Sequence, residues 1–184
     1  MKRRSLLAIF AHPDDEAFGS GGTLARYAAE GVRVGLICAT RGESGKVTDP
    51  ELGQVDDVGA LRQGELERAC EALGIAPPIF LNYRDSGRGQ GLRRNDREAL
   101  INADPLELEG ALLKHIARLE PQIILTFDPH GVYGHPDHLV IHQAASAAFW
   151  SAGGVIKPAP RRLYYTVMAS ERMRTLQAAR EGSP

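Results

Sequence analysis

Two short polar clusters hold most of the side chains in this sequence that could do chemistry. The first reads Ala-His-Pro-Asp-Asp-Glu at residues 11–16, and the second reads Gly-His-Pro-Asp-His at residues 134–138. Imidazole and carboxylate ligands, a spare carboxylate to move a proton and a spare imidazole to stabilise an oxyanion are what a hydrolytic zinc site requires. The clusters are more than 100 residues apart, so only the fold can bring them together.

Within the first cluster, adjacent side chains point in different directions. One carboxylate of the Asp14–Asp15 pair can therefore bind a metal while the other faces the substrate as a base. The alternative is that one of them only caps a helix that begins near Glu16. The neighbouring His12 favours metal chemistry over simple capping.

The second cluster is too dense in polar groups for an ordinary loop. Five such side chains fall within nine residues, namely His130, Tyr133, His135, Asp137 and His138. His135 and His138 need not both bind the metal, because one of them could donate a hydrogen bond to a bound carbonyl. His142, one helical turn beyond His138, could also join the metal, but local packing or hydrogen bonding is the favoured interpretation.

Apolar runs alternate with helical patterns along the whole chain. Continuous runs predict buried strands at residues 6–10, 33–40, 78–82, 122–127 and 163–167. Apolar residues at helical spacing predict helices at residues 17–30, 58–73, 105–119 and 138–150. Repeated β–α units predict one domain with a mostly parallel sheet between two layers of helices.

This architecture explains how the two clusters could meet. If the strand order is one such as 3-2-1-4-5, the first and fourth strands are neighbours, and the crevice between their carboxyl ends is the expected ligand site. Each cluster follows one of these two strands. Two long segments, residues 41–57 and 84–102, are expected to be substrate-binding loops rather than plain surface loops.

Composition narrows the class of protein. The 184 residues carry 22 basic and 23 acidic side chains, so nothing favours a nucleic-acid partner, and no run is long enough to cross a membrane. Cys38 and Cys70 are expected to be packed thiols in a reducing compartment, although one bridge between them is the alternative. The first apolar run is too short for a secretion signal, and we expect a cytoplasmic protein.

The two clusters together resemble the LmbE-like (PIG-L) family of zinc-dependent de-N-acetylases. Shorter matches lie in the same order, among them Thr-Arg-Gly-Glu at residues 40–43 and Arg-Asp-Ser-Gly at residues 84–87. The resemblance covers about residues 5–150 and implies a Rossmann-like three-layer α/β/α sandwich that removes acetyl groups from N-acetylglucosamine-type amines. Family substrates include precursors of mycothiol and bacillithiol, a glycolipid anchor precursor and chitin-derived sugars.

The resemblance also implies a role for individual residues. His12, Asp15 and His138 match the zinc ligands, and Asp14 matches the general base. A protonated His135 would stabilise the oxyanion. Asp137 would orient His135 and favour its charged form, and Tyr133 would lie beside the intermediate. The residues implied to contact the sugar are Glu43, Arg62 and Asp85.

The resemblance further implies a homo-oligomer, and an N-acetylglucosaminyl-malate is the expected substrate. The chain ends at Pro184, whereas family members commonly continue with further strand and helix, so either this is a compact member or its C-terminal part is cut.

Two other interpretations fit parts of the sequence. Zinc could be a purely structural ion in a metal- or sugar-binding module without catalysis, but structural zinc commonly uses cysteines, and neither cysteine is near a histidine cluster. A nucleotide-binding module is suggested by the α/β pattern and the glycines at residues 19–22. Those glycines do not form Gly-x-Gly-x-x-Gly, and they follow an acidic segment that would repel a pyrophosphate.

Overall fold

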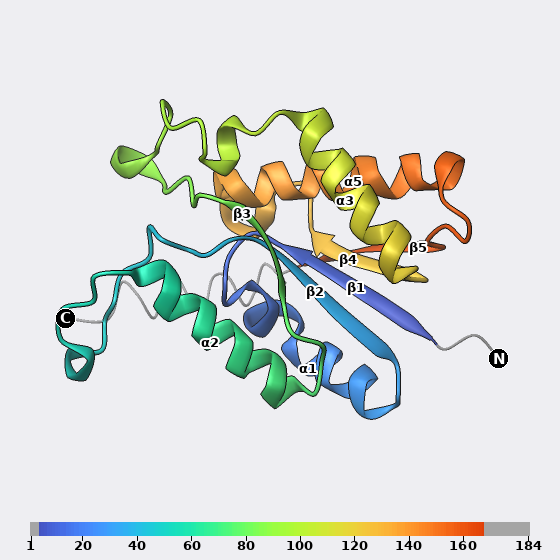
Figure 1. Cartoon of the computed structure of the whole chain (residues 1–184), viewed down its shortest axis with the longest axis horizontal. Helices are drawn as coiled ribbons and strands as arrows, with labels where there is room; N and C mark the ends of the chain where they lie inside the picture. The colour runs from blue at the N-terminus through green and yellow to red at the C-terminus, as the bar shows by residue number, and fades with distance from the viewer. Residues whose placement is uncertain (1–3, 168–184) are drawn as a thin grey trace.

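The computed structural model describes residues 4–167 and contains a five-stranded sheet in which every strand pair is parallel (Figure 1). The strand order is β3-β2-β1-β4-β5, which confirms the predicted order. The strands are β1 (Ser5–Phe10), β2 (Arg33–Thr40), β3 (Ile79–Tyr83), β4 (Ile123–Phe127) and β5 (Arg162–Thr166). The two ends of the domain expected over residues 1–184, residues 1–3 and 168–184, lie outside the described residues.

Helices cover both faces of the sheet, which confirms the three-layer architecture (Figure 1). On one face lie α1 (Asp15–Ala29) and α2 (Val58–Leu73), and on the other lie α3 (Pro105–Leu119) and α5 (Pro136–Val155). A short helical turn, α4 (Gly131–Gly134), precedes α5, and three short 3₁₀ turns lie in the long loops: η1 (Pro50–Leu52), η2 (Gly89–Gly91) and η3 (Leu100–Asn102).

The predicted helices at residues 58–73 and 105–119 have the predicted bounds, and Asp104 caps α3 by accepting hydrogen bonds from the main-chain N–H groups of residues 106 and 107. Two other helices start earlier than predicted. The helix α1 begins at Asp15, and α5 begins at Pro136. In α5 the first residue is Pro136, and proline suits this position because its fixed φ is helical and its missing N–H would have no partner there. Both early starts place cluster residues inside a helix rather than in a loop.

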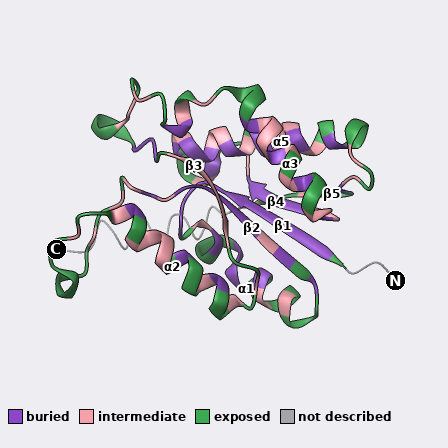
Figure 2. Cartoon of the chain, viewed as in Figure 1, coloured by how far each residue is buried: buried purple, intermediate pink, exposed green. Residues whose placement is uncertain are grey.

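The centre of the sheet is the core of the molecule, as the buried residues in Figure 2 show. Every residue of β1 is buried, as expected for a strand covered on both faces. From α3, the side chains of Leu108, Leu112 and Ile116 pack against this core at helical spacing. Cys38 and Cys70 are both buried and are free thiols, which confirms the prediction for them. The strand β1 and its neighbour β4 are therefore a rigid base for the polar residues that follow them.

Candidate metal centre and active site

The two polar clusters meet at the carboxyl ends of β1 and β4. His12 lies just after β1, and His135 and His138 lie where α5 begins, after β4. The ring centre of His12 is 4.6 Å from that of His135 and 5.3 Å from that of His138. This confirms that strand order brings together residues far apart in the sequence.

The ring of His138 has one engaged nitrogen and one free nitrogen. Its Nδ1 lies 3.1 Å from the carbonyl oxygen of Gly131, and because a carbonyl only accepts, Nδ1 carries the proton. Its Nε2 is buried, has no hydrogen-bond partner among the described residues, and lies 3.2 Å from Oδ1 of Asp15. The ring also stacks on Phe127 at 3.9 Å, which fixes its plane. A lone pair is thus aimed into the space beside Asp15.

His12 is held in a comparable way. Its Nε2 lies 3.0 Å from Oδ2 of Asp137, so this nitrogen donates to the carboxylate. Its Nδ1 is left 3.5 Å from Oδ2 of Asp15, and its main-chain N–H donates to the same oxygen at 2.8 Å. Burial lowers the pKa of His12, but the carboxylates of Asp137 and Asp15 outweigh burial and raise it to about 10. In the metal-free chain these carboxylates therefore favour the protonated His12 ring, and a metal ion at Nδ1 would replace the second ring proton.

Asp15 lies between the two imidazoles. Burial raises the pKa of its carboxyl, but the neighbouring rings of His12 and His138 outweigh burial and hold the pKa below its usual range. A carboxylate only 9% exposed, with one imidazole nitrogen on each side, is a donor set that suits zinc. On each ring, the nitrogen that points away from Asp15 donates its hydrogen to an oxygen: His12 donates to Asp137, and His138 donates to the carbonyl of Gly131. Metal-binding histidines usually have such a partner.

Other donors lie close enough to compete for an ion. Two groups of ligand atoms each fall within 4.8 Å, namely those of His12, His135 and His138 and those of His12, Asp85 and Asp137. In both groups some donors are already engaged. The Nδ1 of His135 accepts from a main-chain N–H, and the carboxylates of Asp85 and Asp137 also accept main-chain N–H groups.

Asp14 precedes α1 in a left-handed conformation, with φ 110° and ψ −27°, and its side chain makes no capping hydrogen bond. The capping alternative for Asp14 is therefore wrong. Its carboxylate instead lies 2.8 Å from a guanidinium nitrogen of Arg62. Burial and the adjacent Asp15 raise the pKa of Asp14, and Arg62 opposes them. A half-exposed carboxylate with a raised pKa, held in a strained backbone, has the properties of a base beside a metal centre.

The carboxylate of Asp137 does not contact His135 in the way that the resemblance implies; it bonds to His12 instead. The carboxylate of Asp137 bonds to His12 and accepts the main-chain N–H of Ser86 at 3.0 Å, and only the main-chain N–H of Asp137 reaches His135, at 3.2 Å from Nδ1. Burial and the repulsion of His12 lower the pKa of His135 to about 4, although Asp137 opposes this. The lowered pKa favours a neutral His135 in the metal-free chain, in contrast to the protonated ring that the resemblance implies. A neutral ring that accepts at Nδ1 carries its proton on Nε2 and can still donate it.

Tyr133 lies on the turn that covers these rings. Val132 beside it has φ 62° and ψ −63°, a strained conformation for a β-branched residue, and its N–H donates to Oδ1 of Asp128 at 2.7 Å. The ring of Tyr133 is 5.2 Å from that of His138 and is about half exposed. Sequence reasoning did not predict this turn, because its conformation is set by Asp128 and the packing of the rings.

The three predicted sugar contacts have different surroundings. Arg62 donates to the carbonyl oxygen of Gly42 at 3.1 Å as well as to Asp14. Glu43 accepts the main-chain N–H of Asp85 at 3.0 Å. Asp85 is buried, and its carboxylate accepts main-chain N–H groups from residues 44 and 87 at 3.2 and 2.8 Å. These bonds join the two long loops, which suits a supporting role for Asp85 better than a direct sugar contact.

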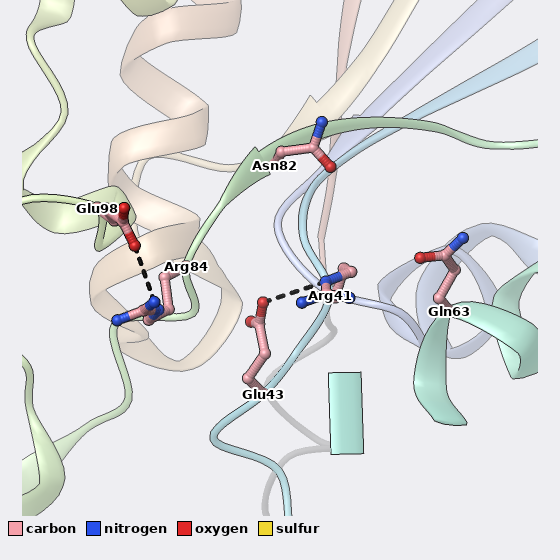
Figure 3. Close-up of a pocket in the computed structure, with 6 residues that line it drawn as sticks. All are labelled: Arg41, Glu43, Gln63, Asn82, Arg84 and Glu98. Atoms are coloured by element: carbon pink, nitrogen blue, oxygen red, sulfur yellow. Dashed lines mark ion pairs between the residues drawn. The ribbon is translucent and has the colours of Figure 1, made fainter. Parts of the chain in front are cut away.

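A polar cavity of about 240 Å³ lies beside these loops, at the ends of β2 and β3 (Figure 3). Its lining residues are Arg41, Glu43, Gln63, Asn82, Arg84 and Glu98. The charges in it are paired with one another: Arg41 with Glu43 at 3.5 Å and Arg84 with Glu98 at 2.8 Å. None of the clustered histidines lines this cavity, and Glu43 connects it to them through Asp85.

Two further histidines lie apart from the rings described above. The Nδ1 of His142 lies 2.8 Å from the carbonyl oxygen of Phe127, which confirms the predicted local hydrogen bond. His130 is exposed. Within residues 4–167, no helix combines the length and the apolar composition needed to cross a bilayer.

Comparison with known proteins adds to this geometry. The chain is 40% identical over 182 residues to 1D-myo-inositol 2-acetamido-2-deoxy-alpha-D-glucopyranoside deacetylase from Rhodococcus jostii, covering 91% of this chain and 62% of that protein. It is 43% identical over 175 residues to the enzyme of the same name from Salinispora arenicola, covering 90% of this chain and 56% of that protein. The chain thus spans less than two thirds of the length of these relatives.

A solved structure and a family match agree with these relatives. The N,N'-diacetylchitobiose deacetylase from Pyrococcus horikoshii superposes with a TM-score of 0.64 and 25% identity, covering 100% of this chain and 72% of that one. Residues 7–149, which include both polar clusters, match the family described as PIG-L, GlcNAc-PI de-N-acetylase. This chain belongs to the PIG-L family.

Proposed function

We propose that this chain is a zinc-dependent hydrolase that removes the acetyl group from an N-acetylglucosamine conjugate. The observation that carries the proposal is the buried Nε2 of His138, which makes no hydrogen bond within residues 4–167 and faces Asp15 at 3.2 Å beside His12. A buried polar atom without a partner is costly unless an ion completes it. The names of the similar deacetylases from Rhodococcus and Salinispora support the reaction class.

For the metal we propose His12 Nδ1, Asp15 and His138 Nε2 as the ligands. In this set each imidazole donates its other N–H to an oxygen, which directs a lone pair toward Asp15. Three protein ligands would leave a coordination position open, as in catalytic rather than structural zinc sites. When bound, zinc would polarise the acetamide carbonyl and lower the pKa of a coordinated water.

The remaining residues have distinct proposed roles. Asp14 accepts the proton of the attacking water, because its raised pKa keeps it a better base than an ordinary surface carboxylate. Arg62 holds Asp14 in place by their 2.8 Å ion pair. The Nε2–H of a neutral His135 donates to the developing oxyanion. Asp137 positions His12 rather than His135, and Tyr133 flanks the reacting carbonyl.

Two conjugates are the leading candidates for the substrate. The inositol conjugate is the substrate in the names of the similar relatives, and the malate conjugate is the one expected from the sequence. Both present the same acetamide to the site, so they differ only in the group attached to the sugar. Glu43 and Arg62 are proposed to bind sugar hydroxyls, since both are partly exposed next to Asp14 or the loops.

The test is a fluorescamine assay for free amine with both conjugates and with N-acetylglucosamine, on protein loaded with zinc and on protein stripped by a chelator. We expect amine release from at least one conjugate, dependent on zinc. Saturable binding of the conjugates without any amine release would contradict hydrolysis and would make the chain a binding module.

A further inference from the structure

Arg88 is an exposed cation one side chain away from the proposed metal ligands. Its guanidinium carbon lies 6.0 Å from the ring centre of Tyr133, and the Tyr133 ring lies 5.2 Å from the ring of His138. Tyr133 therefore lies between the exposed Arg88 and the buried His138. A guanidinium at this distance from an aromatic face is attracted to the ring, which orders both side chains.

Arg88 has no carboxylate within ion-pair distance among residues 4–167, in contrast to Arg62, Arg84 and Arg93. Arg84 pairs with Asp96 at 3.0 Å and with Glu98 at 2.8 Å, and Arg62 pairs with Asp14. The surrounding segment, residues 86–97, carries a surplus of positive charge, because its ionisable residues are Arg88, Arg93, Arg94, Asp96 and Arg97. An unpaired guanidinium in such a segment is available for an anion that comes from outside the chain.

The backbone before Arg88 is fixed to the site. The N–H of Ser86 donates to Asp137, and the N–H of Gly87 donates to Asp85 at 2.8 Å. Gly87 has φ 66°, and a Cβ there would lie 2.7 Å from the carbonyl oxygen of Gly91, so only glycine fits this turn. The loop therefore presents Arg88 from a defined position next to the two buried carboxylates.

We propose that Arg88 is a specificity-determining residue that binds an anionic group, a carboxylate or a phosphate, on the part of the substrate attached to the amino sugar. The proposal rests on the proposed function. With the acetamide at His12 and His138, the rest of a conjugate that extends past Tyr133 reaches Arg88. A guanidinium binds carboxylate or phosphate through two parallel hydrogen bonds, which a neutral polyol cannot match in charge. Conjugates with an anionic substituent are therefore the favoured substrates.

The test compares kcat/KM for N-acetylglucosaminyl-malate, which is anionic, with that for the neutral inositol conjugate. In the zinc-loaded chain we expect the malate conjugate to be preferred. Arg88→Gln should lower the malate-to-inositol ratio of kcat/KM by about tenfold, mainly through KM for malate, which is the size expected for a hydrogen bond to a charged group. Arg88→Lys should restore part of the ratio.

Arg97→Gln is the matched control, because it removes the same charge from the same exposed segment without touching Tyr133. It should leave the ratio within about twofold, the change expected from a distant, screened charge. An unchanged ratio in Arg88→Gln, or an equal ratio change in both variants, would overturn the assignment of Arg88. Wild-type protein that releases amine from neither conjugate would contradict the proposed function itself, and the role of Arg88 with it.

Discussion

At the scale of single residues, the site depends on which atom of each side chain is left free. His12 and His138 each use one ring nitrogen to bond to an oxygen of the protein, so the other nitrogen faces Asp15. Asp14, one position earlier, points instead to Arg62. Adjacent carboxylates thus have different surroundings, as the sequence predicted, and the two should respond differently to the same substitution.

The first prediction concerns this Asp14–Asp15 pair. Asp14→Asn should keep zinc but lower kcat by roughly 10²–10⁴-fold, because an amide cannot accept a proton. Asp15→Asn should instead weaken zinc binding by at least about tenfold, since the amide has no negative charge to offer the metal. Zinc content and single-substrate kinetics on both variants check this. Equal zinc loss in both variants, with equal activity per bound zinc, would show that the two carboxylates share one role.

The second prediction concerns pH. Burial and the repulsion of His12 lower the pKa of His135 to about 4, and a bound metal cation would lower it further. His135 is then neutral above about pH 5 and contributes no falling limb to the profile between pH 6 and 9. His135→Ala should lower kcat by roughly 10²–10³-fold, the usual cost of losing one oxyanion donor, while the shape of the profile in that range is kept. A kcat/KM series over pH is the measurement, and loss of an alkaline limb in the variant would mean that His135 works as a cation.

At the scale of elements, the sequence predicts the helices and strands that follow a periodic apolar pattern, but it does not predict the turns whose conformation depends on tertiary contacts. Strands and helices follow from apolar periodicity, and the meeting of β1 with β4 follows from strand order. The turn α4 and the early start of α5 do not follow, because Asp128, Pro136 and the ring of His138 decide them through tertiary contacts. For the same reason the sequence placed the Asp137 carboxylate beside His135 instead of beside His12.

The third prediction tests whether the turn before α5 holds His138 in place. Gly131 has φ 60°, and a Cβ there would lie 2.9 Å from the Cβ of His138. Gly134 also has a positive φ, 81°, but a Cβ there would meet nothing within 4 Å. Gly131→Ala should therefore weaken zinc binding by about tenfold or more relative to Gly134→Ala, which carries the backbone strain alone. Zinc titrations of the two variants compare them, and equal affinities would mean that the turn does not position the ligand.

At the scale of the whole molecule, the site connects segments that follow three different strands of the sheet, β1, β3 and β4. Residues after β1, after β3 and in the first turn of α5 meet through His12, Asp85 and Asp137, and the main-chain N–H of Ser86 donates to Asp137. A metal bound by residues from separate elements stabilises only the folded chain. The sequence indicated this from the two clusters, but it did not indicate the cross-links that the loops make with Ser86 and Ser44.

The fourth prediction is therefore a metal-dependent stability. Zinc at about 100 times its dissociation constant should raise the free energy of unfolding by about 2.7 kcal/mol. For a domain of this size, that corresponds to a rise in Tm of roughly 5–10 °C. His138→Ala should remove most of the rise. Differential scanning calorimetry with and without zinc measures it, and an equal rise in the variant would place the ion elsewhere.

We propose that one metal ion at His12, Asp15 and His138 makes this chain a de-N-acetylase. The most direct measurement is a titration of the metal-free chain with zinc while free amine is followed on a saturating N-acetylglucosamine conjugate. We expect no amine release before zinc is added, and a rate that rises linearly and levels off at about one zinc per chain. Full activity in the metal-free chain, or no amine release at any amount of zinc, would contradict it.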